Sequence, residues 1–320
     1  MNFHHIPVML NEVITYLDLQ HGGTYVDCTL GGGGHTSEII EKIQPGGRVI
    51  GIDQDPNALE AARKYLNRYS ESINFVHSNF YRLKDIVAET GLIEVDGVLF
   101  DLGVSSHQLD EGDRGFSYMQ DALLDMRMNP EDPVTAEKLV NELSEEELAK
   151  VIKDYGEERW AKRIAQFIVD YRQNERIHTT GELVEIIKRA IPAGARREGP
   201  HPAKRTFQAL RIAVNDELNR FANSLKDAVD ILKPGGRVCV ISFHSLEDRI
   251  TKEVFRDLAK TCICPPEMPV CRCNKQKQVD IITGKPVLPG EEEIAANPRA
   301  RSAKLRVAQK CRVLNSRKGE

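Results

Sequence analysis

Three acidic residues end or interrupt strand-like runs in the first third of the chain, where each could contact a bound ligand. Asp27 lies in TYVDCT, just before GGGGH (31–35); Asp53 ends RVIGID; and Asp101 ends DGVLFD. A strand that enters a helix through glycine lets a ligand approach the main chain closely. An acid at the end of the second strand can accept both ribose hydroxyls of an adenosine. This pattern favours a ligand that contains a nucleoside.

The glycine turn matches neither of the common phosphate-binding fingerprints. Starting from Gly31, the third glycine of a dinucleotide G-x-G-x-x-G motif would fall on Thr36. A P-loop would end in Gly-Lys-Ser/Thr, but GGHT contains no lysine. A bare turn still admits a bulky cofactor without a pyrophosphate. The turn therefore favours S-adenosylmethionine and argues against a nicotinamide-dependent dehydrogenase.

Two further strand ends complete the predicted cofactor crevice. Phe80 follows the run INFVHS (73–78) and could lie against the adenine, although a phenylalanine there could equally belong to the core. Asp101 leaves the fourth run where it would face both cofactor and substrate. Asp53, 20 residues after Gly33, could instead be a helix cap or a solvated charge. Its position in series with the glycine turn favours the binding role.

The elements that position these residues alternate between strands and helices. Strand-like runs occupy residues 24–29, 48–53, 73–78 and 96–101, and a helical pattern occupies 56–69. Such alternation predicts crossover units and a parallel sheet. A fifth strand is expected at 237–243 and a last one in KLRVAQKCRV near the end.

After residue 105 the alternation stops and a helical block of about 130–195 follows. Ser144 with Glu147, and Thr179 with Glu182, form capping boxes at predicted helix starts. One apolar stripe then predicts a single long helix over 207–229, and the segment 261–303 reads as irregular. The predicted fold class is α/β, with a core of residues 1–110 and 205–320 and an all-helical, substrate-recognising insertion of 111–204.

Seven segments in order resemble the bacterial small-subunit rRNA (cytosine-N4)-methyltransferase family. They are HIPVML, VDCTLGGGGHT, DLGVSSHQLD, RGFSY, HPAKRTFQALRIAVNDEL, LKPGGRV with ISFHSLEDR, and NPRARSAKLR. The resemblance implies a class I S-adenosylmethionine-dependent methyltransferase, Rossmann-like, with a mostly parallel seven-stranded sheet. It implies N4-methylation of a decoding-centre cytidine of 16S rRNA within the small ribosomal subunit. By position, its cofactor contacts would be Gly33, Gly34, His35, Asp53, Phe80, Asp101 and Gln108.

The exocyclic amine of cytosine is a poor nucleophile, so an enzyme must position it and accept its hydrogens. Asp101 is the candidate acceptor, and it could also serve the cofactor alone. DNA amino-methylases commonly follow the corresponding residue with two prolines and an aromatic, whereas this chain has Leu102, Gly103 and Val104. A methyltransferase acting on another nucleic acid or on a small molecule remains the alternative. No catalytic metal is expected, because the methyl donor is already activated.

Basic segments suggest an anionic partner, although the net charge of the chain is -4. Seven basic residues and one acid lie between Lys188 and Arg211, and Lys204 and Arg205 are the predicted phosphate contacts. Ordinary surface charge is the competing interpretation. No oligomeric state follows from the sequence.

The cysteines leave two interpretations open. Cys262, Cys264, Cys271 and Cys273 form C-x-C-x6-C-x-C, which could hold zinc or consist of free thiols. Zinc-binding pairs usually have longer spacing. Seven cysteines without a secretory signal fit a cytoplasmic protein, and no apolar run reaches the roughly 18 residues of a membrane span.

Overall fold

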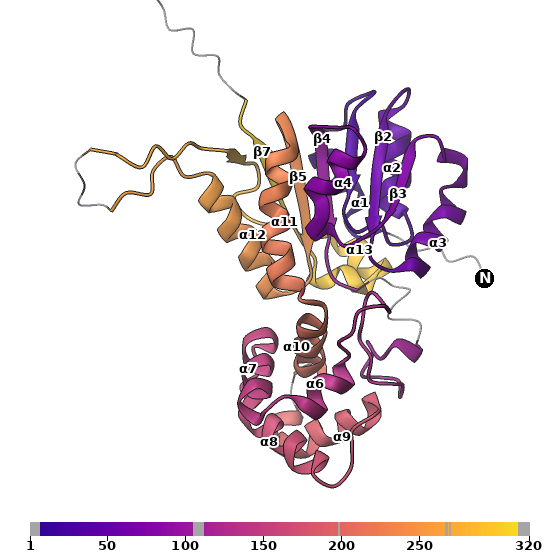
Figure 1. Cartoon of the computed structure of the whole chain (residues 1–320), viewed down its shortest axis with the longest axis vertical. Coiled ribbons are helices and arrows are strands. Elements are labelled where there is room, and N and C mark those ends of the chain that lie inside the picture. The colour runs from indigo at the N-terminus through magenta and orange to yellow at the C-terminus, as the bar shows by residue number, and fades with distance from the viewer. Residues whose placement is uncertain (1–6, 105–111, 198, 266–267, 269, 313–320) are drawn as a thin grey trace, which may run out of the picture. The chain divides into compact units, whose positions relative to one another are not determined.

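The computed structural model describes residues 7–104, 112–197, 199–265, 268 and 270–312 (Figure 1). The chain divides into two compact units, residues 1–103 with 218–320 and residues 104–217. The second unit therefore also contains α10 (Lys204–Asn215), most of which lies in the segment that the sequence assigns to the core. Gln108, a predicted cofactor contact, lies outside the described residues.

The first unit is built on a seven-stranded sheet with the order β3-β2-β1-β4-β5-β7-β6. The five strands β3, β2, β1, β4 and β5 run parallel to one another. β7 is antiparallel to both β5 and β6. The predicted mostly parallel seven-stranded fold is confirmed. The strands are β1 (Thr24–Asp27), β2 (Arg48–Asp53), β3 (Ile73–His77), β4 (Val95–Asp101), β5 (Leu232–Ser242), β6 (Val279–Ile281) and β7 (Lys304–Lys310).

Apolar residues alternate between the two faces of this sheet. In β4, Leu99 packs with one buried cluster and Phe100 with the other, as successive side chains of a strand point to opposite faces. One face is covered by α1 (Leu10–Leu17), α2 (Gly34–Ile43) and α3 (Pro56–Tyr65). The other is covered by α4 (Leu83–Glu89), α11 (Glu217–Ile231) and α12 (Ser245–Leu258). Burial on both sides explains the uninterrupted apolar runs VLF (98–100) in β4 and VCVI (238–241) in β5.

The second unit packs its helices around a separate apolar cluster. Besides α10, they are α6 (Ala136–Glu142), α7 (Glu145–Gly156), α8 (Ala161–Arg172) and α9 (Thr180–Ala190). Ser144 and Thr179 cap α7 and α9, and each forms the predicted capping box with the glutamate three residues later. In the part of the chain that the structure describes, no helix is long and apolar enough to cross a membrane.

The single helix predicted over 207–229 is wrong. Asp216 takes a left-handed conformation (φ 48°), which ends α10 at Asn215 and lets α11 begin at Glu217. The contacts of the buried Asn215 side chain explain why α10 ends at this residue. Its amide donates to the carbonyl of Met126 and its oxygen accepts from the N–H of Met128, so tertiary contacts hold the helix end.

The prediction that 261–303 is irregular is wrong in part. Its residues include β6, at the edge of the sheet, and α13 (Glu291–Ala296). Val279 is fully buried and anchors β6 against the core. A strand of three residues is too short to show a periodic pattern, and pairing with β7 stabilises it.

Candidate active site

The carboxyl ends of β1, β2 and β4 meet at the topological switch point of the sheet. In the sheet, β2 and β3 lie on one side of β1, whereas β4, the next strand along the chain, lies on the other side of β1. Ligands of open α/β sheets bind outside the carboxyl ends at such a point. Asp27, Asp53 and Asp101 lie at these three ends, as the sequence predicts.

In the glycine turn between β1 and α2, Gly33 and Gly34 are explained by packing within the protein. Gly33 has φ 85°, and a Cβ there would lie 2.7 Å from a methyl of Leu66. A Cβ on Gly34 would lie 2.5 Å from the Pro7 ring. Protein packing therefore already requires these two glycines, both predicted as cofactor contacts.

Gly32 is the glycine of the turn that packing does not explain. It is exposed and has no left-handed φ, and a Cβ there would meet no atom of the described residues within 4 Å. The sequence reading missed this residue, because a run of four glycines does not show which of them faces a ligand. Its main chain is the open point of the turn.

The carboxylate of Asp53 is oriented by two main-chain hydrogen bonds and can accept further ones. Its Oδ2 accepts from the N–H of Gly31 (2.8 Å) and its Oδ1 from that of Asp55 (2.9 Å). A carboxylate oxygen has two lone-pair directions, so each oxygen retains one for a ligand hydroxyl. Burial raises the pKa of Asp53 to about 6, against the lowering effect of these two amide donors. The side chain is therefore mostly ionised at neutral pH.

Asp27 supports the site through hydrogen bonds to neighbouring residues. It is buried, and its carboxylate accepts from Thr36 Oγ1 (2.7 Å) and from the N–H of Thr29 (3.1 Å). Thr29 Oγ1 in turn accepts from the main-chain N–H of Asp101 (2.7 Å). Burial raises the pKa of Asp27 to about 6. These bonds connect the ends of β1 and β4.

Asp101 carries a buried acceptor that the described residues do not satisfy. Its Oδ1 is shielded from solvent and has no hydrogen-bond partner among them. Its Oδ2 lies 3.7 Å from Nδ1 of His35, which is beyond hydrogen-bonding distance. Burial, followed by the nearby carboxylates of Asp27 and Glu247, raises the pKa of Asp101 well above its usual range. An unsatisfied buried acceptor typically costs about 1–3 kcal/mol, so this oxygen is a candidate ligand contact.

His35 and Phe80 flank the site while also serving the core. His35 is buried in the first turn of α2, with Nε2 3.0 Å from the carbonyl of Val8. Phe80 is half-buried and packs its ring edge to face with Phe100 at 5.6 Å. Both therefore have packing roles, and their predicted cofactor contacts stay predictions.

Comparison with known proteins agrees with this geometry. The profile of the MraW methylase family matches residues 2–311. The chain belongs to the MraW methylase family. The resemblance seen in the seven sequence segments is confirmed over almost the whole chain.

The methylase is similar along its whole length to curated relatives. It is 58% identical over 310 residues to "Ribosomal RNA small subunit methyltransferase H" of Clostridioides difficile, covering 97% of this chain and 100% of that protein. The identity is also 58% to the protein of the same name from Brevibacillus brevis, with coverages of 97% and 99%. A crystal structure described as a putative rRNA methylase from Clostridium thermocellum aligns with a TM-score of 0.45 at 13% identity, covering 96% and 99% of the two chains.

The predicted phosphate contacts open α10 in the second unit of the methylase. Lys204 and Arg205 are both exposed. The Arg205 guanidinium donates to the carbonyl of Glu157 (3.0 Å), the residue that follows α7. Arg205 therefore also closes a helix end, whereas the structure shows no such contact for the Lys204 side chain among the described residues.

Proposed function

We propose that this methylase transfers a methyl group from S-adenosylmethionine to N4 of a cytidine in the decoding centre of 16S rRNA. The observation that carries the proposal is the unsatisfied Oδ1 of Asp101, buried at the switch point of a methylase-family sheet. The names of relatives at 58% identity support the small-subunit rRNA as the substrate.

The residues present fit an adenosine-containing cofactor. Asp53 offers two oriented oxygens to ribose hydroxyls, and the open main chain of Gly32 admits a close neighbour. Gly33, Gly34 and His35 shape the turn, and Phe80 offers its exposed part to the adenine. When bound, S-adenosylmethionine supplies a methyl group already activated by its sulfonium, which is why no catalytic metal is expected.

Asp101 fits the role of hydrogen acceptor for the cytosine amine. The lone pair of this amine is delocalised into the ring, so the amine becomes more nucleophilic as its hydrogen is drawn to an acceptor. The raised pKa of Asp101 makes its carboxylate a stronger base than an ordinary aspartate. With the cofactor bound, its sulfonium would supply the methyl group to N4, and Asp101 would take the proton that leaves N4.

The second unit would bind the rRNA backbone. Lys204 and Arg205 are exposed cations that can neutralise phosphates without reading sequence. Contacts of this kind position the substrate while the base enters the site unpaired or flipped from its stack. An enzyme that acts on the small ribosomal subunit would work in the cytoplasm, where ribosomes are.

The test is a comparison of methyl acceptors. Labelled S-adenosylmethionine is incubated with the enzyme and small subunits lacking the modification, naked 16S rRNA, large subunits or duplex DNA. We expect label in the small subunit or its rRNA and none in the last two. Asp101→Asn, which keeps the side-chain shape, should bind the cofactor yet transfer little methyl. Preferential labelling of DNA would contradict this proposal and indicate that the enzyme methylates another nucleic acid.

A further inference from the structure

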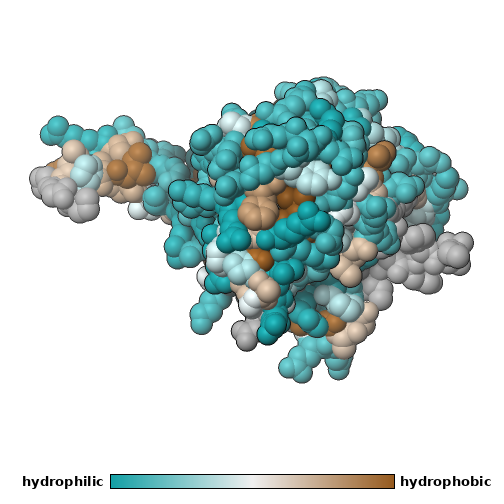
Figure 2. All heavy atoms as spheres, turned by 90° about the horizontal axis from the view of Figure 1, so that it is seen from below, coloured by the Kyte–Doolittle hydropathy of each residue, from teal (hydrophilic) through white to brown (hydrophobic). Residues whose placement is uncertain are grey.

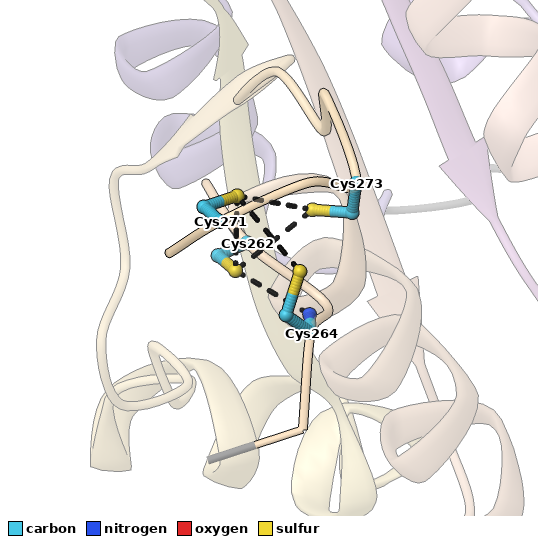
Figure 3. Close-up of side chains that lie close together, drawn as sticks. All are labelled: Cys262, Cys264, Cys271 and Cys273. Carbon is cyan, nitrogen blue, oxygen red and sulfur yellow. Dashed lines mark hydrogen bonds between the residues drawn. The ribbon is translucent and has the colours of Figure 1, made fainter. Parts of the chain in front are cut away.

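Four cysteines gather in the segment between α12 and β6, and we name its described residues, 260–265, 268 and 270–278, the cysteine loop. Figure 1 shows this segment extending away from the helices and sheet of the first unit. Its base is anchored, because the N–H of Gln278 donates to the carbonyl of Leu258 (2.8 Å). Cys262, Cys264, Cys271 and Cys273 converge at one point within it (Figure 3).

The sulfur positions match a single tetrahedral metal. Closest pairs lie 3.4 Å (Cys262–Cys271) and 3.5 Å (Cys271–Cys273) apart, and all four atoms lie within 4.8 Å of one another. Four sulfurs at the zinc–sulfur distance of about 2.3 Å would be about 3.8 Å apart. A disulfide needs about 2.05 Å. In a [4Fe–4S] cluster each cysteine binds a different iron, and in a [2Fe–2S] cluster the cysteines divide between two irons, so either cluster would hold some of the sulfurs further apart.

Main-chain amides point at the sulfurs. The N–H of Ile263 donates to Cys273 Sγ (3.3 Å), that of Cys264 to Cys262 Sγ (3.3 Å), and that of Arg272 to Cys264 Sγ (3.4 Å). Hydrogen bonds to ligand atoms orient them and offset the negative charge of thiolates around a metal. The short C-x-C spacing is therefore no obstacle, since the backbone turns tightly enough to bring both members of each pair together.

The described residues of the cysteine loop beyond its anchored base are not held by an apolar core. None of its described residues belongs to the buried apolar clusters of the first unit. Ile263 and Val270, beside the cysteines, are 59% and 66% exposed, and Figure 2 shows apolar surface on the projecting segment. A segment without a core is commonly held by disulfides or a structural metal.

We propose that Cys262, Cys264, Cys271 and Cys273 bind one zinc ion as four thiolates. Four protein ligands fill a tetrahedral shell and leave no open position, so the ion is structural and takes no part in methyl transfer. On binding, four thiols lose their protons to solvent and four Zn–S bonds form. The ion would hold the cysteine loop in its folded form.

The test is metal analysis of untagged protein purified without chelators. We expect about one zinc per chain by plasma mass spectrometry, and loss of that zinc in the double variant Cys262→Ser/Cys271→Ser. Cys311→Ser is the matched control, because Cys311 is a partly exposed cysteine outside the cluster, and it should retain the metal. Zinc-free wild type that binds no added zinc, or zinc that survives the double substitution, would overturn the proposal. So would stoichiometric iron or copper in its place.

A second measurement uses the wild type alone. A strong chelator should remove the zinc and speed tryptic cleavage after Arg272 or Lys275, while cofactor affinity stays unchanged. Replacing zinc with cobalt should produce the visible bands of a tetrahedral thiolate site. Cleavage in the cysteine loop that is equally fast with and without metal would contradict the structural role.

Discussion

Gly32→Ala tests whether the cofactor packs on the main chain of the glycine turn. A methyl group at this position meets no described protein atom within 4 Å and no left-handed φ opposes it. Folding should therefore be unchanged or gain about 0.4–1 kcal/mol, the usual effect of Gly→Ala where the backbone permits it. If a ligand packs on this main chain, the added carbon overfills the interface at a cost of about 1–3 kcal/mol. That cost corresponds to roughly 5- to 150-fold weaker binding.

The assay is calorimetric titration with S-adenosylmethionine at 25 °C, with a thermal melt of each protein alongside. Gly284→Ala is the matched control, because Gly284 is also exposed, without a left-handed φ and without a described neighbour within 4 Å of an added Cβ. The control should bind like the wild type. Wild-type affinity in Gly32→Ala would refute the view that the turn is open there to admit the cofactor.

Three further predictions concern other parts of the protein. Protonation of Asp53, whose pKa is raised to about 6, would remove the charge that is proposed to contact the ribose hydroxyls. Cofactor affinity should therefore fall as the pH drops below about 6. Calorimetric titrations between pH 5 and 8 would contradict this if the affinity did not change with pH. Lys204→Ala should reduce the slope of log affinity against log salt for small-subunit binding by about 0.7–0.9, whereas Lys150→Ala, an exposed lysine paired with Asp154, should not. Ser144→Ala removes the N-cap of α7 and should lower unfolding stability by about 1 kcal/mol in denaturant titrations, a loss that an unchanged midpoint would exclude.

The strands and the acidic part of the site were predictable because their signals are local. Burial on both faces of the sheet gives β2 and β4 short apolar runs, and the acid that ends each of these strands stands out against its run. Asp53 and Asp101 come together because parallel strands end at one edge of the sheet. The capping boxes were equally visible, since both partners lie within one turn.

The features that the sequence did not reveal depend on distant residues. The helix break at Asp216 is held by Asn215 contacting the segment near Met126, almost ninety residues away in the chain. Gly33 is required by Leu66, a neighbour that no local pattern indicates. The spacing of the four cysteines left zinc binding and free thiols both open, and the structure shows that the two pairs fold back on each other.

The central claim is that the site at the switch point methylates the exocyclic amine of cytidine. Its most direct test is nucleoside analysis by mass spectrometry of 16S rRNA from unmodified small subunits, after reaction with the enzyme and labelled S-adenosylmethionine. We expect labelled N4-methylcytidine at one decoding-centre position with the wild type, and almost none with Asp101→Asn. Label in a different nucleoside, such as a ring-carbon-methylated cytidine, or undiminished N4-methylation by Asp101→Asn would contradict it.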